Sequence, residues 1–244
     1  MPKTFTLGIV VPTYKEKENI TELLTQIKEE VEAHKIKTVV LVMDDNSPDG
    51  TADIVRAIIE NNKSSFLSIR LHVRPGKMGL GSAYTTGLTM LQPESEYLQE
   101  MDADLSHRPQ YLHVFLEKAQ SGYDAVFGSR YVLGGGIENW GPVRKFISFG
   151  GSLYSRAVLG VGISDFTGGY NLYKATVFDT IKLDEIGAEG YLFQIEMKYK
   201  TARSGLKYTE SPIIFPDRAQ GKSKFDKRIF LEAITGVWKL RFGK

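Results

Sequence analysis

Acidic and polar side chains gather directly after three short apolar stretches of the sequence. The three clusters are Pro12-Thr13-Tyr14-Lys15-Glu16, Asp44-Asp45-Asn46-Ser47 and Asp102-Ala103-Asp104. If the apolar stretches are strands of one parallel sheet, their carboxyl ends lie along the same edge, where open α/β folds bind their ligands. We therefore expect clusters that are far apart in the sequence to converge on one crevice.

The pair Asp102 and Asp104 has the chemistry of a divalent-metal site. Mg²⁺ and Mn²⁺ prefer oxygen ligands, and Mg²⁺ is typically held by one or two carboxylates together with substrate phosphates. A cation at this position would neutralise a diphosphate and stabilise it as a leaving group. A solvated turn is the alternative for any single pair of this kind. The matching clusters after two other strands favour the metal.

The first two clusters have side chains that suit a nucleotide. Asp45 follows a buried strand, and its carboxylate could accept hydrogen bonds from the ring N–H groups of a base, although a turn or a helix cap ahead of Gly50 is the alternative. Tyr14 could stack on a base, and Glu16 could bond a base or a ribose. A plain loop is the alternative for both.

Basic residues stand where they could meet phosphates. Arg130 follows another predicted strand, and Arg144 and Ser148 open the helix predicted after the glycine-rich loop 134–141. Arg218 and Lys224 lie in the irregular basic segment 217–224, for which a solvated surface is the alternative. Arginine suits bidentate phosphate recognition, whereas lysine acts as a point charge.

The segment from Arg74 to Ala83 introduces a predicted helix whose first N–H groups could face an anion. Its glycines match neither a Walker loop nor a G-x-G-x-x-G fingerprint, so they identify no nucleotide-binding motif. Close packing of the helix on the sheet would also explain Gly79 and Gly81. The four histidines have no metal-ligand spacing, and for His107, the one near the aspartates, capping or packing is the default.

Hydrophobic periodicity predicts strands that alternate with helices through the first half, and hence an α/β fold with a largely parallel sheet covered on both faces. Strands are expected at Leu7 to Pro12, Val39 to Met43, Leu67 to Val73, Tyr97 to Met101 and Ala125 to Phe127, with two short ones near Tyr208 and Ile213. Helices are expected around Ile20 to Val31, Ile54 to Ile59, Gly79 to Leu91, Pro109 to Gln120, Val143 to Leu159 and Tyr191 to Arg203. Asn19 with Glu22 resembles a capping box. We see no repeat or linker and expect one domain, 1–244.

Composition excludes several classes of protein. The 244 residues contain no cysteine, which rules out disulfides, thiolate metal sites and a cysteine nucleophile and agrees with a reducing compartment. A formal charge of +2 is too small to indicate a nucleic-acid partner. No apolar run approaches the roughly 18 residues of a membrane span, so a lipid substrate would be met at the membrane surface. The apolar arc in 225–244 predicts an amphipathic helix, which suits an interface, a membrane subunit or the domain's own core about equally.

Six stretches in this order are similar to the dolichyl- or polyprenyl-phosphate mannose synthases, within the inverting glycosyltransferases of family 2, which have the GT-A fold. The stretches are 10–20, 43–51, 101–107, 128–131, 165–170 and 215–224. The resemblance implies that GDP-mannose is the donor, that Mg²⁺ or Mn²⁺ is the cofactor, and that dolichyl or polyprenyl phosphate is the acceptor. Some relatives have Gln in place of Ser106, which leaves a direct metal bond there in doubt.

The resemblance also implies a role for individual residues. The guanosine would be bound by Pro12, Tyr14, Glu16, Asp45 and backbone near Met43, and the nucleotide and metal by Asp102, Ala103 and Asp104. Arg218 and Lys224 would grip the donor diphosphate, while Arg130, Arg144 and Ser148 would receive the lipid phosphate, with Asp104 and Arg130 essential for turnover. Many relatives append transmembrane helices. Their absence here implies peripheral attachment to the cytoplasmic face of a membrane through amphipathic segments or small membrane-anchoring subunits.

The implied chemistry needs no protein base. A phosphate monoester with a second pKa of about 6 is largely a dianion at neutral pH, so the nucleophile is ready. Two alternatives remain open at this point. One is another family 2 transferase with a UDP-sugar donor or a hydroxyl acceptor, which would need a general base. The other is a non-catalytic nucleotide-binding or lipid scaffold.

Overall fold

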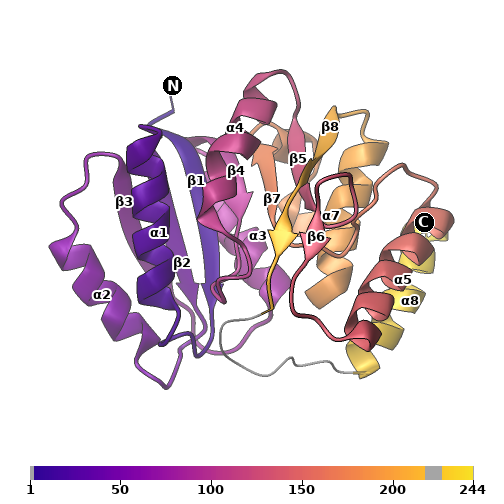
Figure 1. Ribbon diagram of the computed structural model, residues 1–244, viewed down its shortest axis with the longest axis horizontal. Coiled ribbons are helices and arrows are strands. Elements are labelled where there is room, and N and C mark those ends of the chain that lie inside the picture. The colour runs from indigo at the N-terminus through magenta and orange to yellow at the C-terminus, as the bar shows by residue number, and fades with distance from the viewer. Residues whose placement is uncertain (1–2, 218–226, 244) are drawn as a thin grey trace.

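The computed structural model describes residues 3–217 and 227–243, and its central element is a seven-stranded sheet in the order β3-β2-β1-β4-β7-β5-β8 (Figure 1). Every neighbouring pair is parallel except those that involve β7, which runs antiparallel between β4 and β5. The strands are β1 (Phe5–Thr13), β2 (Thr38–Asp44), β3 (Leu67–Val73), β4 (Ser95–Glu100), β5 (Ala125–Ser129), β7 (Asn171–Lys174) and β8 (Tyr208–Pro212). The expected mostly parallel α/β sheet is confirmed.

Helices cover both faces of this sheet. They are α1 (Ile20–Ala33), α2 (Thr51–Asn61), α3 (Leu80–Leu91), α4 (Leu112–Gln120), α5 (Pro142–Leu159), α6 (Val177–Thr180), α7 (Gly190–Arg203) and α8 (Lys227–Phe242), with short 3₁₀ turns at Pro109–Tyr111 and Leu183–Glu185. One apolar core joins α1, α2 and α4 to one face, and a second joins α3, α6 and α7 to the other. Alternation along β1 divides the cores, since Ile9 belongs to the first and Val10 to the second.

The second half adds a smaller layer beyond the sheet. A two-stranded parallel pair forms from β6 (Gly136–Ile137), inside the glycine-rich loop, and β9 (Ile214–Phe215). Figure 1 shows α5 and α8 side by side at the end of the molecule away from α2, and α8 also packs against α7. Within the described residues, no helix is both long and apolar enough to cross a membrane.

The structure confirms most of the expected elements and corrects two details. The five residues that set the helical period of α1, Ile20 to Val31, are its buried residues. The capping box is wrong, because the Asn19 side chain makes no cap bond and instead donates to Glu16 Oε2 at 2.8 Å. Strand β7 was missed. It has four residues, too few for a period, and begins with the buried polar Asn171.

Candidate active site

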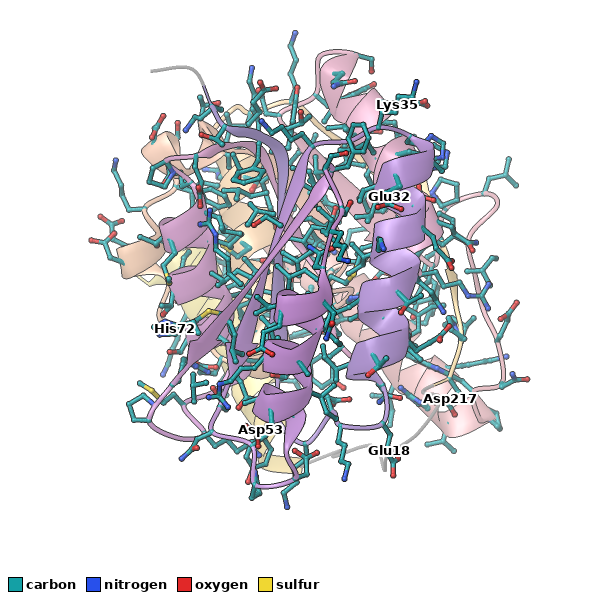
Figure 2. The ribbon with its side chains drawn as sticks, turned by 90° about the vertical axis from the view of Figure 1, so that its left-hand side faces the viewer. Glu18, Glu32, Lys35, Asp53, His72 and Asp217 are labelled. Atoms are coloured by element: carbon teal, nitrogen blue, oxygen red, sulfur yellow. The ribbon has the colours of Figure 1, made fainter. Side chains whose placement is uncertain are left out.

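The first two polar clusters meet at the carboxyl edge of the sheet. Thr13 pairs with Asp44 in the β1–β2 register, and its hydroxyl donates to Asp44 Oδ2 at 2.8 Å. The backbone N–H of Lys15 donates to Ser47 Oγ at 3.0 Å, and that hydroxyl donates in turn to Asp44. Asp44 therefore fastens one loop to the other. Figure 2 shows Glu18 and Asp53, which follow these two strands, at the same end of the molecule.

Asp45 is buried beside an arginine that sequence analysis did not assign to it. Arg74 follows the end of β3, and its Nε donates to Asp45 Oδ1 at 2.5 Å while the backbone N–H of Met78 donates to Oδ2 at 3.2 Å. The same guanidinium also donates to Ser82 Oγ and to the Gly79 carbonyl. These bonds are neither a turn nor a helix cap, so the alternative given for Asp45 is wrong. Its carboxylate is held rigidly at the edge.

The other residues predicted to bind the nucleotide surround this pair. Pro12 lies opposite the buried Met43 in the β1–β2 register. The Tyr14 ring lies under Lys77, whose ammonium is 5.0 Å from the ring centroid. Glu16 accepts the Asn19 amide, as described above, and its own N–H donates to Thr51. The predicted nucleotide residues of β1 and β2 thus form one contiguous edge.

Asp102 and Asp104 lie in the bend that follows β4. The Tyr84 hydroxyl donates to Asp102 Oδ1 at 2.7 Å, and the Ser106 hydroxyl and N–H donate to Asp104 Oδ1 at 2.5 and 3.1 Å. Burial, together with the charges of Asp102 and Asp104, raises the pKa of Tyr84 well above its usual value, which keeps the phenol a donor. Ala103 between the two aspartates is buried.

The ring of His107 sets the position of Asp102. The Asp102 backbone N–H donates to His107 Nδ1 at 2.8 Å, and the imidazole stacks on Tyr170 with centroids 4.8 Å apart. Burial lowers the pKa of His107 despite the nearby carboxylates, so the ring is neutral with its proton on Nε2. The default of packing is correct for this histidine.

These two carboxylates fit a divalent cation. Their oxygens are the hard ligands that Mg²⁺ and Mn²⁺ prefer, and the side chain of Asp102 is 31% exposed, which leaves it open to a ligand. Hydrogen bonds from Tyr84 and Ser106 orient both groups, as outer-shell partners do in metal sites. The metal role of the pair remains a prediction.

Backbone strain is concentrated in the same loops. In the described part of the chain, five non-glycine residues have positive φ. Three of them are Lys15 (63°), Asn46 (54°) and Leu105 (63°), and one lies in each polar cluster or directly after it. A left-handed conformation costs an L-residue roughly 1–2 kcal/mol. Such strain persists where the surrounding structure fixes it, and it gathers at functional sites.

The anion expected at the start of α3 is part of the protein itself. The N–H groups of Gly81 and Ser82 donate to the Glu189 carboxylate at 2.8 and 3.0 Å. A Cβ on Gly81 would lie 2.6 Å from the Ala188 carbonyl, so this glycine allows the segment before α7 to approach α3. The bond ties α3, beside the nucleotide edge, to α7.

Arg130 follows β5 and forms a buried ion pair. Its Nε and Nη2 donate to the two oxygens of Asp165, both at 2.7 Å, and Nη2 also donates to Thr167 at 2.8 Å. Burial opposes ionisation of Asp165, but the charges of Arg130 and Lys198 outweigh it and hold the pKa of Asp165 at about 2. Asp165 was not singled out by sequence analysis, which quoted it only inside the 165–170 stretch.

The three residues predicted to receive the acceptor phosphate line one cavity. This cavity of about 780 Å³ lies between α5, α7 and α8, with Arg130, Arg144 and Ser148 in its wall. The rest of the wall is mainly apolar: Trp140, Val143, Phe146, Ile147, Tyr154, Ile195, Ile234 and Val237. The Arg144 guanidinium lies 3.7 Å from the Trp140 ring centroid and donates to the exposed Asp217 at 2.5 Å. A long apolar molecule with an anionic head fits such a cavity.

Hydrogen bonds continue from Arg130 to Ser148. Thr167 lies 3.5 Å from the Ser148 hydroxyl, which also accepts the Tyr131 hydroxyl at 2.8 Å. The structure thus brings the three predicted acceptor residues together. Arg218 and Lys224 lie outside the described residues, so their roles in donor binding remain predictions.

Comparisons with known proteins agree with this architecture. Residues 8–182 match the family model described as glycosyl transferase family 2. The chain is 40% identical over 229 residues to the undecaprenyl-phosphate mannosyltransferase of Micrococcus luteus, covering 93% of this chain and 90% of that protein. It is 37% identical over 239 residues to the polyprenol monophosphomannose synthase of Mycolicibacterium smegmatis, covering 96% and 86%.

Solved structures share the fold. The glucosyl-3-phosphoglycerate synthase of Mycobacterium tuberculosis in complex with Mn²⁺, uridine diphosphate and glucosyl-3-phosphoglycerate superimposes with a TM-score of 0.69 at 17% identity, over 97% of this chain and 80% of that one. The same enzyme with Mg²⁺ and uridine diphosphate gives a TM-score of 0.67. At this identity the likeness establishes the fold alone, which is GT-A.

Proposed function

Because the chain belongs to glycosyl transferase family 2, we propose that it transfers mannose from GDP-mannose to dolichyl or polyprenyl phosphate, with inversion at the sugar carbon. The observation that carries the proposal is the apolar cavity whose wall contains Arg130, Arg144 and Ser148. Polyprenyl phosphate has the matching chemistry, with a hydrocarbon chain behind an anionic head. Two relatives that align over most of this chain are named as an undecaprenyl-phosphate mannosyltransferase and a polyprenol monophosphomannose synthase, which supports mannose and a polyprenyl-phosphate acceptor.

In this proposal the donor binds along the edge formed by β1, β2 and β4. Asp45, fixed by Arg74, accepts the base N–H groups, and Asp102 and Asp104 hold Mg²⁺ or Mn²⁺. The cation supplies charge neutralisation to the diphosphate leaving group. The acceptor phosphate needs no base, and the residues of this chain orient its oxygen toward the sugar and exclude water.

The two arginines divide the work at the acceptor phosphate. The Arg130 side chain is 4% exposed, and Asp165 largely cancels its charge. Arg130 therefore acts as a rigidly placed hydrogen-bond donor that exerts little long-range attraction on a phosphate. Arg144 is 31% exposed, and its partner Asp217 is 44% exposed, so this pair is weak and can exchange for a phosphate. We therefore assign most of the attraction for the acceptor to Arg144.

We also propose that the exposed apolar stripe of α5, part of which lines the cavity, lies on the membrane. Val143, Phe146, Phe149 and Leu153 recur at helical spacing and are 52–78% exposed, and Trp238 and Phe242 of α8 are exposed as well. An exposed apolar stripe of this size is typical of a lipid or partner interface. It would place the cavity where a polyprenyl chain can leave the bilayer, on the cytoplasmic face, with or without small anchoring subunits.

The test is a transfer assay with Mg²⁺ or Mn²⁺, a short polyprenyl phosphate, and GDP-mannose in parallel with UDP-glucose. GDP-mannose should give a mannosyl lipid of inverted configuration, and UDP-glucose should give no glycolipid. Unphosphorylated polyprenol should not be a substrate. Asp104→Ala should abolish turnover, while Asp53→Asn, an exposed carboxylate at the same end of the molecule, should not. Arg144→Ala should raise the KM for polyprenyl phosphate about tenfold or more and leave the KM for the donor unchanged. Transfer from UDP-glucose, or to a hydroxyl acceptor only, would refute the proposal.

A further inference from the structure

We propose a second metal site, chemically distinct from the aspartate pair, formed by Glu30, His34 and His113. Within the described residues these three side chains, which come from α1, its C-cap residue and α4, bring their ligand atoms within 4.8 Å of one another. Glu30 Oε1 lies 2.6 Å from His113 Nδ1 and 3.7 Å from His34 Nε2. The two histidines show no metal-ligand spacing in the sequence, because His34 and His113 are far apart along the chain and meet only where α1 packs against α4.

The site lies far from the donor edge. Glu30 and His34 stand at the C-terminal end of α1, whose first residue follows the β1 loop that carries Tyr14 and Glu16. Figure 2 shows this separation, with Glu32 and Lys35 at one end of the molecule and Glu18 at the other. A cation bound here would join α1 to α4 and take no part in the transfer.

The two imidazoles and one carboxylate of this site favour a transition-metal ion over Mg²⁺. Nitrogen-rich sites of this kind suit Zn²⁺, Ni²⁺ and Cu²⁺, whereas Mg²⁺ demands oxygen ligands. Three protein ligands with water in the fourth position are a common arrangement for Zn²⁺. The side chains are partly accessible, with exposed fractions of 13% for Glu30, 29% for His113 and 40% for His34. An ion can therefore enter without unfolding.

Binding requires two side-chain adjustments. The two imidazole rings are stacked at 3.9 Å with planes only 7° apart, and a metal that lies in one ring plane cannot also lie in the other. Tetrahedral bonds of about 2.0–2.1 Å place ligand atoms about 3.3 Å from one another. Glu30 Oε1 and His113 Nδ1, which are 2.6 Å apart, must therefore move slightly apart to admit the ion. His34 caps the end of α1 and is the most exposed of the three, so its ring can turn about its side-chain bonds to reach this geometry.

The experiment is thermal unfolding of the whole, metal-stripped protein in excess Mg²⁺, titrated with ZnCl₂. We expect Zn²⁺ to raise Tm in a saturable, one-equivalent titration, and Co²⁺ to give the visible absorption of a four-coordinate site. His34→Gln and His113→Gln should each weaken the apparent Zn²⁺ affinity at least about tenfold. His72→Gln, on β3 and outside the cluster, is the matched control and should retain it.

The outcomes separate the site from its alternatives. Because His34 is exposed at a helix end, His34→Gln should fold normally, and mannosyl transfer with Mg²⁺ should be unchanged. A zinc shift that persists in both His34→Gln and His113→Gln belongs to the aspartates or another surface and overturns the proposal. No zinc shift at all would leave only a stacked histidine pair bonded to Glu30, and would overturn it equally.

Discussion

Replacing Glu100 with glutamine should remove a pH dependence from the stability of the protein. Glu100 ends β4, two residues before Asp102, and its side chain is fully buried. Its Oε2 accepts the Asn171 amide at 3.0 Å, and within the described part of the chain its Oε1 has no hydrogen-bond partner. Burial raises the pKa of Glu100 from 4.5 to about 8, against that hydrogen bond and the charge of Lys198. The carboxyl group is therefore protonated at neutral pH.

The sign of the effect follows from the raised pKa. The folded state keeps a proton that the unfolded state releases above pH 4.5, so the free energy of unfolding falls as pH rises from about 4.5 to 8. Each pH unit in this window is worth about 1.36 kcal/mol. Between pH 5.5 and 7.5 the wild type should therefore lose about 2.7 kcal/mol relative to Glu100→Gln, which cannot ionise.

Urea unfolding of the two proteins at pH 5.5, 6.5 and 7.5 measures this difference. Burial lowers the pKa of Lys198 to about 8, so the lysine is charged in both proteins at pH 5.5 and 6.5 and largely charged at pH 7.5. Glu96→Gln is the matched control, since Glu96 lies on the same strand and is exposed. Its unfolding free energy should run parallel to that of the wild type. If the Glu100→Gln values also run parallel to the wild type, Glu100 is ionised when folded and the reasoning is refuted.

Two further substitutions test the fixed geometry of the site. Asp165→Asn leaves the buried Arg130 without its counter-charge, so it should lower the free energy of unfolding by about 3–5 kcal/mol in urea, and a loss below about 1 kcal/mol would contradict a tight buried pair. Lys15→Gly relieves a φ of 63°, whereas Lys17→Gly is an exposed glycine substitution in the same loop without positive φ. The free energy of unfolding of Lys15→Gly should therefore be about 1–2 kcal/mol higher than that of Lys17→Gly. Equal values would mean that the Lys15 backbone is unstrained.

The sequence predicted what depends on local pattern. Periodicity located α1 by its buried residues, and apolar runs that end in polar residues located the edge where Asp45 and Asp102 lie. A signal for Arg74 was also present, because it follows the end of β3 just as Asp45 follows β2. Its position directly after a predicted strand therefore indicates that Arg74 lies at the site.

Partners that arrive from distant elements had no local signal. Tyr84 reaches Asp102 only because α3 packs on the face of the sheet over β1 and β4, and Glu189 reaches Gly81 across 108 positions of sequence. Strand β7 is too short to have a period, and its place between β4 and β5 is fixed by packing on both faces. Such contacts form only in the tertiary structure and leave no local pattern in the spacing of residues along the sequence.

The pairing of Arg130 with Asp165 has a consequence for how two anions can share one site. A bare guanidinium in an apolar cavity would attract the donor diphosphate as strongly as the acceptor phosphate, because the field of a charge in a low-dielectric wall is weakly screened. The net charge of the Arg130–Asp165 pair is small. Arg130 can therefore orient a phosphate only at short range, through the direction of its N–H groups. In the proposed reaction, long-range attraction then falls to Arg144, whose side chain is 31% exposed and whose partner Asp217 is 44% exposed. Arg130 would thus orient an acceptor that Arg144 has drawn in, and Arg144→Ala should lose more of its acceptor rate at low salt than at high salt.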